Sequence, residues 1–289
     1  MSLLHVVILL AAMAGQAENE RMKPAAVQDP IDQALHQMYN ADFAGGQTII
    51  ADEIRKRPED PFLHALRATG LLFAEFDRMK ILELDFFADD DSLTDRKKLK
   101  PDPVVGMEFF RATGEARRLA SKRLETDPND TNAIYALFVA VGVETDYVLL
   151  VEKKYIRSYS LAKEGQKYAS RLLVMNPPVY DAYLNSGMME YVVGNLNFFF
   201  RWFVHFDQIK GNKQKAIDCL KLVIERGRYY APYAKILLSV IYLREKKPEQ
   251  ALVLLKELEI DFPLNPLIRK EVLRISSQSG SGKPGKTAR

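Results

Sequence analysis

The hydrophobic and polar positions of this chain follow a helical period over most of its length. Apolar residues recur three and four positions apart in successive stretches, and pairs of stretches end in turns that contain proline or glycine. Five pairs can be recognised between residues 28 and 270, and their first stretches are PIDQALHQMYN, PFLHALRATG, NAIYALFVAVG, VYDAYLNSGM and PYAKILLSVI. The pattern predicts an all-α fold of about five helix pairs.

Small residues occupy a fixed place in the second helix of each pair. Gly46, Ala116 and Gly165 each lie twelve residues before a closing proline, and Ala216 lies thirty-five residues before Ala251. Because a small side chain lets two antiparallel helices approach closely, we expect these five positions to lie at helix–helix contacts.

The last pair is the most regular of the five. Counted from Pro232 as the first position of a 34-residue unit, positions 7, 8, 11, 20, 24 and 32 are Leu238, Ser239, Tyr242, Ala251, Leu255 and Pro263. This segment resembles a tetratricopeptide repeat. The resemblance implies a right-handed solenoid of helical hairpins over residues 28–270, and a protein that acts by binding rather than by catalysis.

The spacing of the closing prolines differs from that of the family. Pro58, Pro128 and Pro177 are 70 and 49 residues apart, which is more than a 34-residue repeat requires. We therefore expect long insertions between paired helices, at residues 78–106, at 143–160 and around the run NFFFRWFVHF (197–206). Exported bacterial repeat proteins, including the tetratricopeptide-repeat partners of TRAP-type transporters, are similar in carrying such insertions.

The two ends of the chain read differently from its middle. Residues 1–17 combine about a dozen apolar residues with small ones, too few to span a bilayer, and predict a signal peptide cleaved after Ala14 or Ala17. A buried N-terminal helix and a misplaced start codon are the alternatives, because the first ten residues contain no Lys or Arg. Export to the periplasm or cell envelope follows from the first interpretation. Residues 276–289, SSQSGSGKPGKTAR, predict a disordered tail.

Charge and chemistry add few functional signals. The net charge of +3 falls to zero without the last fourteen residues, so no basic surface for nucleic acid is expected. The single cysteine, Cys219, lies on an amphipathic helix and is predicted to be a half-buried apolar residue. The aspartates at 85–95 lack the glycine and glutamate of a calcium-binding loop, and the four histidines have no zinc-binding spacing. We expect no catalytic residue, no metal and no cofactor.

An apolar groove is the candidate site. In tetratricopeptide repeats the first helix of each pair lines the concave surface, which assigns Leu184, Met188 and Tyr191 of the fourth pair and Tyr233, Ile236, Val240, Leu243 and Arg244 of the fifth. The predicted function is that of an envelope scaffold that binds a protein partner in this groove. The alternative is a periplasmic carrier or transporter accessory that binds a small hydrophobic ligand.

The run at 197–206 is expected to lie beside this groove. On a helix, Phe199, Trp202, Phe203 and Phe206 share one face. Three interpretations stay open: the run packs as core against the repeats, it contributes Trp202 and Phe206 to the binding site, or it makes peripheral contact with a membrane. Ten residues are too few for a transmembrane span.

Overall fold

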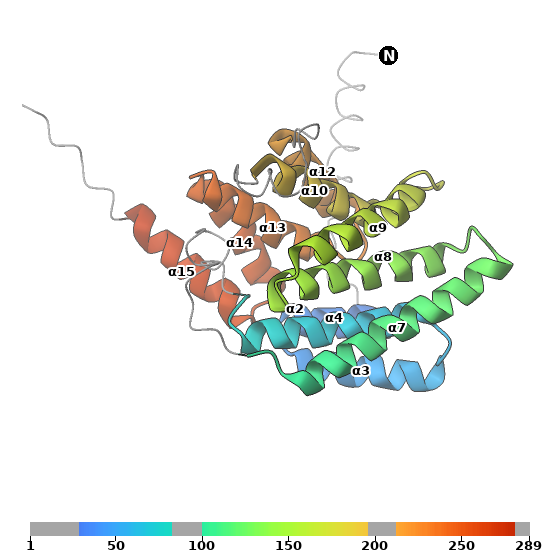
Figure 1. The fold of residues 1–289 in the computed structure, drawn as a ribbon. Helices are drawn as coiled ribbons and strands as arrows, with labels where there is room; N and C mark the ends of the chain where they lie inside the picture. Colours follow the sequence, from blue (N-terminus) through green and yellow to red (C-terminus); the bar gives the residue numbers. More distant parts are fainter. Residues whose placement is uncertain (1–28, 83–99, 196–211, 281–289) are drawn as a thin grey trace, which may run out of the picture.

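The computed structural model describes residues 29–82, 100–195 and 212–280, and these residues form helices and no strand. The helices follow one another as five antiparallel pairs and a final helix (Figure 1). The pairs are α2 (Pro30–Tyr39) with α3 (Phe43–Lys56), α4 (Pro61–Arg78) with α7 (Pro103–Thr126), α8 (Thr131–Asp146) with α9 (Tyr155–Leu173), α10 (Tyr183–Asn195) with α12 (Lys213–Arg226), and α13 (Ala231–Arg244) with α14 (Pro248–Asp261). The final helix is α15 (Pro266–Gly280). For the residues that the structure describes, the prediction of an all-α fold built from helix pairs is confirmed.

Aspartate followed by proline marks the start of three helices. The carboxylates of Asp29, Asp60 and Asp102 accept hydrogen bonds from backbone N–H groups two residues later, at 2.9, 3.0 and 2.8 Å. Proline follows each of them, at a position whose N–H would have no partner within the helix. The chain thus ends one helix and opens the next within a few residues, which keeps neighbouring helices antiparallel.

Small residues lie where paired helices cross, as predicted. Ala116, Ala216 and Ala251 have no exposed surface. A Cβ atom on Gly46 would lie 2.7 Å from Cγ of Met38 and 2.8 Å from the carbonyl oxygen of Ala34. Helices α2 and α3 can therefore approach as closely as they do only with glycine at position 46.

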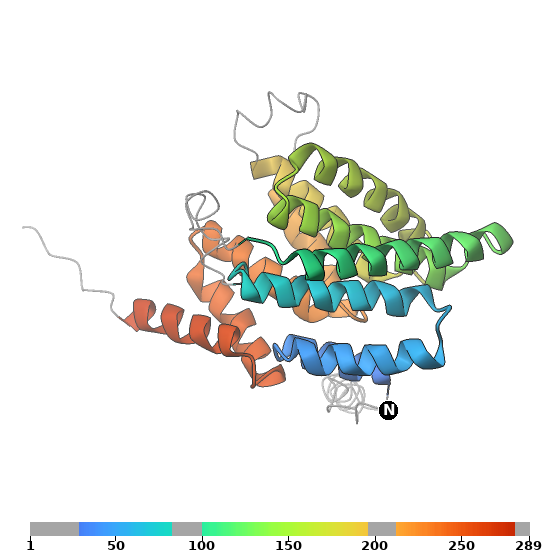
Figure 2. The same cartoon turned by 60° about the horizontal axis from the view of Figure 1, so that its bottom comes forward.

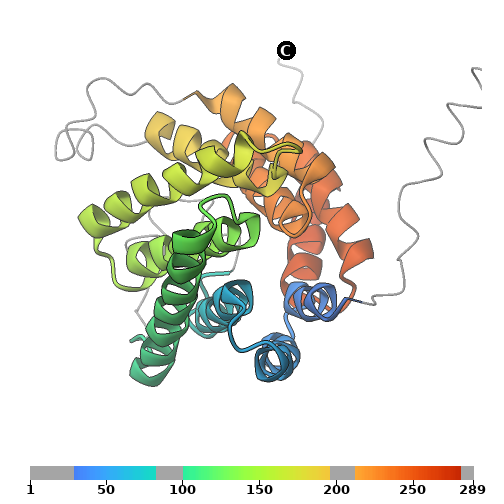
Figure 3. The same cartoon turned by 90° about the vertical axis from the view of Figure 1, so that its right-hand side faces the viewer.

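The first and last hairpins meet, so the array curves into a ring. The side-chain amide of Asn265 donates to the carbonyl oxygen of Tyr39 at 2.8 Å, and the N–H of Leu264 donates to Oδ1 of Asn40 at 3.0 Å. The rings of Tyr39 and Phe262 lie 5.2 Å apart. Figures 2 and 3 show α2, in blue, next to α15, in red.

Helix α8 runs through the middle of the protein and packs on α4, α7 and α9. It continues into a π-helical turn, η1 (Tyr147–Val151), which is closed by the N–H of Glu152 donating to the carbonyl oxygen of Tyr147 at 3.1 Å. Among the described residues, Thr131–Val151 is the one helix long and apolar enough to cross a membrane. Of its most apolar window, 72% is buried inside the protein, as in the core helix of a globular domain.

Two of the predicted boundaries are wrong. Residues 143–160 do not form an inserted segment, because Tyr147, Val148 and Val151 are buried and continue α8 through η1 almost to the start of α9. The tail was expected from residue 276, but α15 extends to Gly280, since Ile268, Val272 and Ile275 pack against α14 at helical spacing. The expected insertion at 78–106 ends in the first turn of α7 and lies partly outside the described residues, as do residues 1–17 and 197–206.

Candidate ligand pocket

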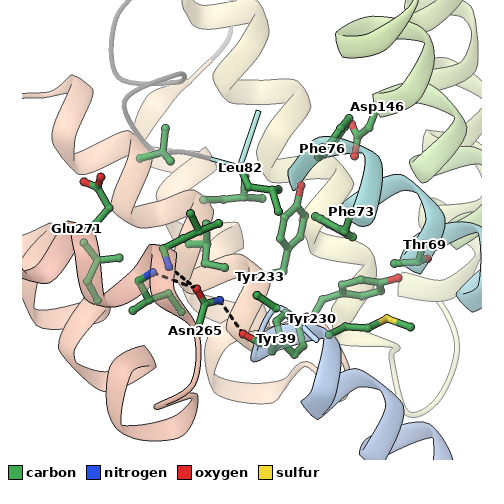
Figure 4. A pocket seen from close by; sticks show the side chains of 18 of the residues that line it. Tyr39, Thr69, Phe73, Phe76, Leu82, Asp146, Tyr230, Tyr233, Asn265 and Glu271 are labelled. Atoms are coloured by element: carbon green, nitrogen blue, oxygen red, sulfur yellow. Dashed lines mark hydrogen bonds between the residues drawn. The ribbon is translucent and has the colours of Figure 1, made fainter. Parts of the chain in front are cut away.

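A pocket of about 420 Å³ lies inside the ring of hairpins (Figure 4). Its wall combines the first hairpins with the last ones. The main contributors are Leu35, Met38 and Tyr39 of α2, Phe73 and Phe76 of α4, Leu149 and Leu150 of η1, Met188 and Tyr191 of α10, Tyr233, Ile236 and Val240 of α13, and Leu267 and Ile268 of α15. Most of these side chains are apolar, so the interior of the pocket is hydrophobic. The pocket forms because the first and last hairpins meet.

Six of the ten residues predicted for the groove line this pocket. Met188 and Tyr191 come from α10, and Tyr233, Ile236, Val240 and Arg244 come from α13. The structure therefore brings together the apolar faces of α10 and α13, the first helices of the fourth and fifth pairs. The sequence places these two faces on one concave surface.

The other four predicted residues do not line the pocket or cannot be placed. Leu184 packs against the main core instead. Leu243 packs against the cluster formed by Ile268, Val272 and Ile275, because α15 offers an additional apolar face there that the sequence pattern did not reveal. Trp202 and Phe206 lie outside the described residues.

Aromatic rings form one wall of the pocket. The ring of Phe73 lies 6.0 Å from that of Phe76 and 5.6 Å from that of Tyr233, and both pairs meet edge to face. The ring of Tyr230 lies 6.4 Å from that of Tyr233. Edge-to-face packing directs the electron-rich face of some of these rings toward neighbouring groups, which makes the wall suited to apolar and cationic ligands.

The tyrosine hydroxyls on this wall are used within the protein. Tyr39 donates to the carbonyl oxygen of Tyr229 at 2.9 Å, and the Tyr230 hydroxyl shares a hydrogen bond with Thr69. Burial is the main cause that raises the pKa of Tyr39, Tyr230 and Tyr233, so all three stay neutral near pH 7. They contribute shape and packing rather than charge.

Two carboxyl groups line the pocket, and they differ in their surroundings. Glu271 is buried and pairs with Arg274 at 2.6 Å. Asp146, at the end of α8, receives no hydrogen bond and no ion pair from any described residue, and burial raises its pKa to about 7. Figure 4 shows the two on opposite sides of the pocket, with the aromatic wall next to Asp146. The rest of the charged lining is Arg244 and Lys270.

Sequence reasoning missed the contributions of α2, α4, α8 and α15 to the pocket. Phe73, Phe76 and Asp146 belong to first helices of earlier pairs, and the rule that assigned α10 and α13 could have been applied to them as well. An open solenoid keeps the first and last repeats apart, so this rule alone does not place these residues in one pocket with α10 and α13. Closure involves contacts such as that of Tyr39 with Phe262. These two residues are more than two hundred positions apart in the sequence, so no local pattern reveals their contact.

Other candidate chemistry stays outside the pocket. Across the described ranges, no group of three His, Cys, Asp or Glu side chains lies close enough to hold a metal ion. Cys219 is buried against α10, and burial raises the pKa of its thiol, which is the opposite of an activated nucleophile. Asp181 is fully used as an acceptor, from the Tyr135 hydroxyl at 2.7 Å and from the N–H groups of Tyr229 and Tyr230 at 3.2 and 3.3 Å.

Comparisons with known proteins do not assign a function to this chain. No family model matches the chain, and the comparisons with curated proteins and with solved structures found no match.

Proposed function

We propose that this protein binds a small, largely apolar molecule in the pocket inside its ring of hairpins, without catalysing a reaction on it. The observation that carries the proposal is a pocket of about 420 Å³ whose lining is mostly aliphatic and aromatic, with a few polar groups. Small-molecule sites in proteins have this size range and this composition. The role that fits is that of an exported carrier or a transporter accessory.

The apolar lining itself supports a ligand. Exposing apolar surface to water costs roughly 25 cal/mol per Å², so an apolar pocket favours occupation by an apolar molecule over water. The wall is built from helices held by direct hydrogen bonds between the two ends of the chain, such as that from Asn265 to Tyr39 at 2.8 Å. A pocket with a wall fixed in this way is largely formed before the ligand arrives.

A tetratricopeptide-like, right-handed arrangement of the hairpins is part of the proposal. It is supported by the last pair, in which Ser239 and Ala251, the two small positions of the repeat, have no exposed surface. It is also supported by the regular packing of each helix on the next one in the sequence. In such an array the first helices face inward, which agrees with the pocket contributions of α2, α4, α10 and α13.

A protein-binding groove remains the other prediction from sequence, and the pocket favours the small ligand over it. An amphipathic helix of a partner is about 10 Å across and needs an open groove along several helices. Here residues from α2, α4, α10 and α15 all line the same pocket. A partner would then contribute a single side chain to the pocket rather than a segment.

The proposal is tested with N-phenyl-1-naphthylamine, an uncharged dye whose fluorescence rises in apolar sites. We expect saturable binding of one dye per chain. Ile236→Trp, which places an indole in the pocket, should weaken binding by roughly tenfold or more. Val253→Trp is the matched control, because Val253 lies on α14 with 59% of its surface exposed and does not line the pocket. Equal binding by Ile236→Trp and the wild type, or no binding by the wild type, would contradict the proposal.

A further inference from the structure

Asp146 is a carboxyl group on the wall of an apolar pocket, and among the described residues it has no hydrogen-bond or ion-pair partner. It ends α8 immediately before the π turn η1, and its side chain is partly exposed to the pocket. Burial of a carboxyl group costs free energy unless hydrogen bonds or an opposite charge compensate for it. Since no described residue supplies either, the missing partner is expected to come from the ligand.

The groups that surround Asp146 supply rings and hydroxyls rather than a cation. Tyr230, just before α13, and Tyr233 of α13 are the titratable groups whose charge would affect Asp146, and both stay neutral near pH 7. Helix α4 contributes Phe73, Phe76 and Thr69 to the pocket.

None of the other charged groups described on α8 or in the lining pairs with Asp146. The acidic neighbour on α8, Glu144, pairs with Arg117 and Arg157 at 3.4 and 2.9 Å. Arg244 and Lys270 reach the pocket from the end of α13 and from α15. The Arg244 side chain interacts with the Tyr191 hydroxyl. Burial is the one cause of the raised pKa of Asp146, so none of these basic groups among the described residues offsets the cost of its charge.

A carboxylate next to several aromatic rings is a recognition site for organic cations. The quadrupole of an aromatic ring attracts an ammonium group, and a carboxylate accepts its hydrogen bonds. An anionic or purely apolar ligand would leave the Asp146 carboxyl buried without compensation.

We propose that the ligand of this pocket is an amphiphilic amine, whose protonated amino group binds Asp146 beside Phe73, Phe76 and Tyr233 while its apolar part fills the remaining pocket. The inference rests on the proposed function, since it assigns a chemical class to the molecule bound there. The aliphatic side chains of Met188, Ile236 and Ile268 then contact the apolar part.

Binding of an amine at Asp146 is expected to depend on pH. Burial raises the pKa of Asp146 to about 7, so the carboxyl group is partly protonated at neutral pH. The ammonium group binds the ionised form, and the apparent affinity should therefore rise from about pH 6 to about pH 8. It should fall again near pH 10, where the amine loses its proton. A neutral ligand should not follow this profile.

The test compares three probes that share one chain and differ in head group: dodecylamine, 1-dodecanol and dodecanoate. Each is titrated at about pH 8 against the full-length protein loaded with N-phenyl-1-naphthylamine, and dye displacement gives the affinity. We expect dodecylamine to bind roughly tenfold or more tightly than 1-dodecanol, and dodecanoate to bind most weakly.

Two substitutions of Asp146 separate its charge from its shape. In Asp146→Asn and Asp146→Leu the ratio of amine to alcohol affinity should fall close to one, and the rise between pH 6 and pH 8 should disappear. Asp218→Asn is the matched control, since Asp218 is exposed on α12 outside the pocket and its loss removes the same charge. Far-UV circular dichroism establishes that each variant is folded.

Failure of the inference and failure of the proposed function give different results. Equal affinities for the amine and the alcohol in the wild type, or an amine preference that survives in both Asp146 variants, would overturn the amine assignment and leave the apolar pocket standing. Absence of binding by the dye and by all three probes would overturn both.

Discussion

Gly46 lies where α2 and α3 cross, and its role can be tested against a glycine with free space. A Cβ atom at position 46 would meet Met38 at 2.7 Å and the backbone of Ala34 at 2.8 Å, whereas one at Gly114 of α7 would meet nothing within 4 Å. We expect Gly46→Ala to lower the free energy of unfolding by about 1–3 kcal/mol through overpacking. Gly114→Ala should raise it by roughly 0.5–1 kcal/mol through helix propensity. Urea denaturation followed by circular dichroism measures both, and equal effects would contradict the close crossing.

Asp146 should also make the stability of the ligand-free protein depend on pH. Its folded-state pKa of about 7 lies above the ordinary value of 3.8, so its contribution to stability is present at low pH and is lost as the pH rises from about 4 to about 7. The asparagine in Asp146→Asn cannot ionise, so this variant does not lose that stability as the pH rises. Relative to the wild type, the variant should gain stability between pH 5 and pH 8. The difference in melting temperature between the wild type and Asp146→Asn is measured at pH 5 and at pH 8. An equal difference at the two pH values would refute a raised pKa for the buried Asp146.

Single residues were predictable from the sequence where their role is local. The small side chains at helix crossings are predicted by a fixed distance to the closing proline. Met188, Tyr191 and Ile236 are each predicted by a position within their own helix pair. Asp146 was not predictable as a site residue, because its significance depends on the rings that α4 and α13 place next to it. Those contacts join distant parts of the chain.

At the scale of elements, Asn265 joins the last helix to the first. Its side-chain oxygen caps α15 by accepting from the N–H groups of Leu267 and Ile268 at 2.9 and 3.1 Å, and its amide donates to the carbonyl oxygen of Tyr39 at 2.8 Å. Asn265→Ala should lower the free energy of unfolding by about 1–2 kcal/mol.

Asn265→Asp provides the matched comparison, because a carboxylate keeps the cap and loses the donor to Tyr39. If closure matters for the pocket, this variant should weaken binding of the naphthylamine dye while α15 stays folded, as judged by hydrogen exchange of its amides. Dye binding equal to that of the wild type would show that the ends of the chain need not be joined at this point.

The elements themselves were predicted better than their lengths. Proline-containing turns and periodic apolar positions located all five pairs. The sequence predicts an insertion over residues 143–160 and a tail from residue 276, whereas the structure has the π turn Tyr147–Val151 and a helix over Pro266–Gly280. Both become helical through packing on neighbouring helices, which a single segment does not reveal.

The whole molecule is a closed array, and closure should affect how it unfolds. Open repeat proteins lose their terminal repeats first, because each repeat contacts only its neighbours. Here α2 also contacts α15 and the loop before α13, where Arg228 lies 3.4 Å from both Asp29 and Asp32. We expect the backbone amides of α3 and α14 to be equally protected against hydrogen exchange. They should lose this protection at the same urea concentration. Earlier exchange in α14 alone would show that the last hairpin opens independently.

The pocket exists only at this largest scale, since no single hairpin forms it. Its volume of about 420 Å³ and its apolar lining carry the claim that the protein binds a small apolar molecule. Native mass spectrometry of the purified wild type and of Ile236→Trp, each after exposure to one equivalent of dodecylamine, tests that claim most directly. The account predicts one bound amine per wild-type chain, lost on denaturation, and little or none on the variant. Equal occupancy of the two proteins, or no occupancy of either, would contradict it.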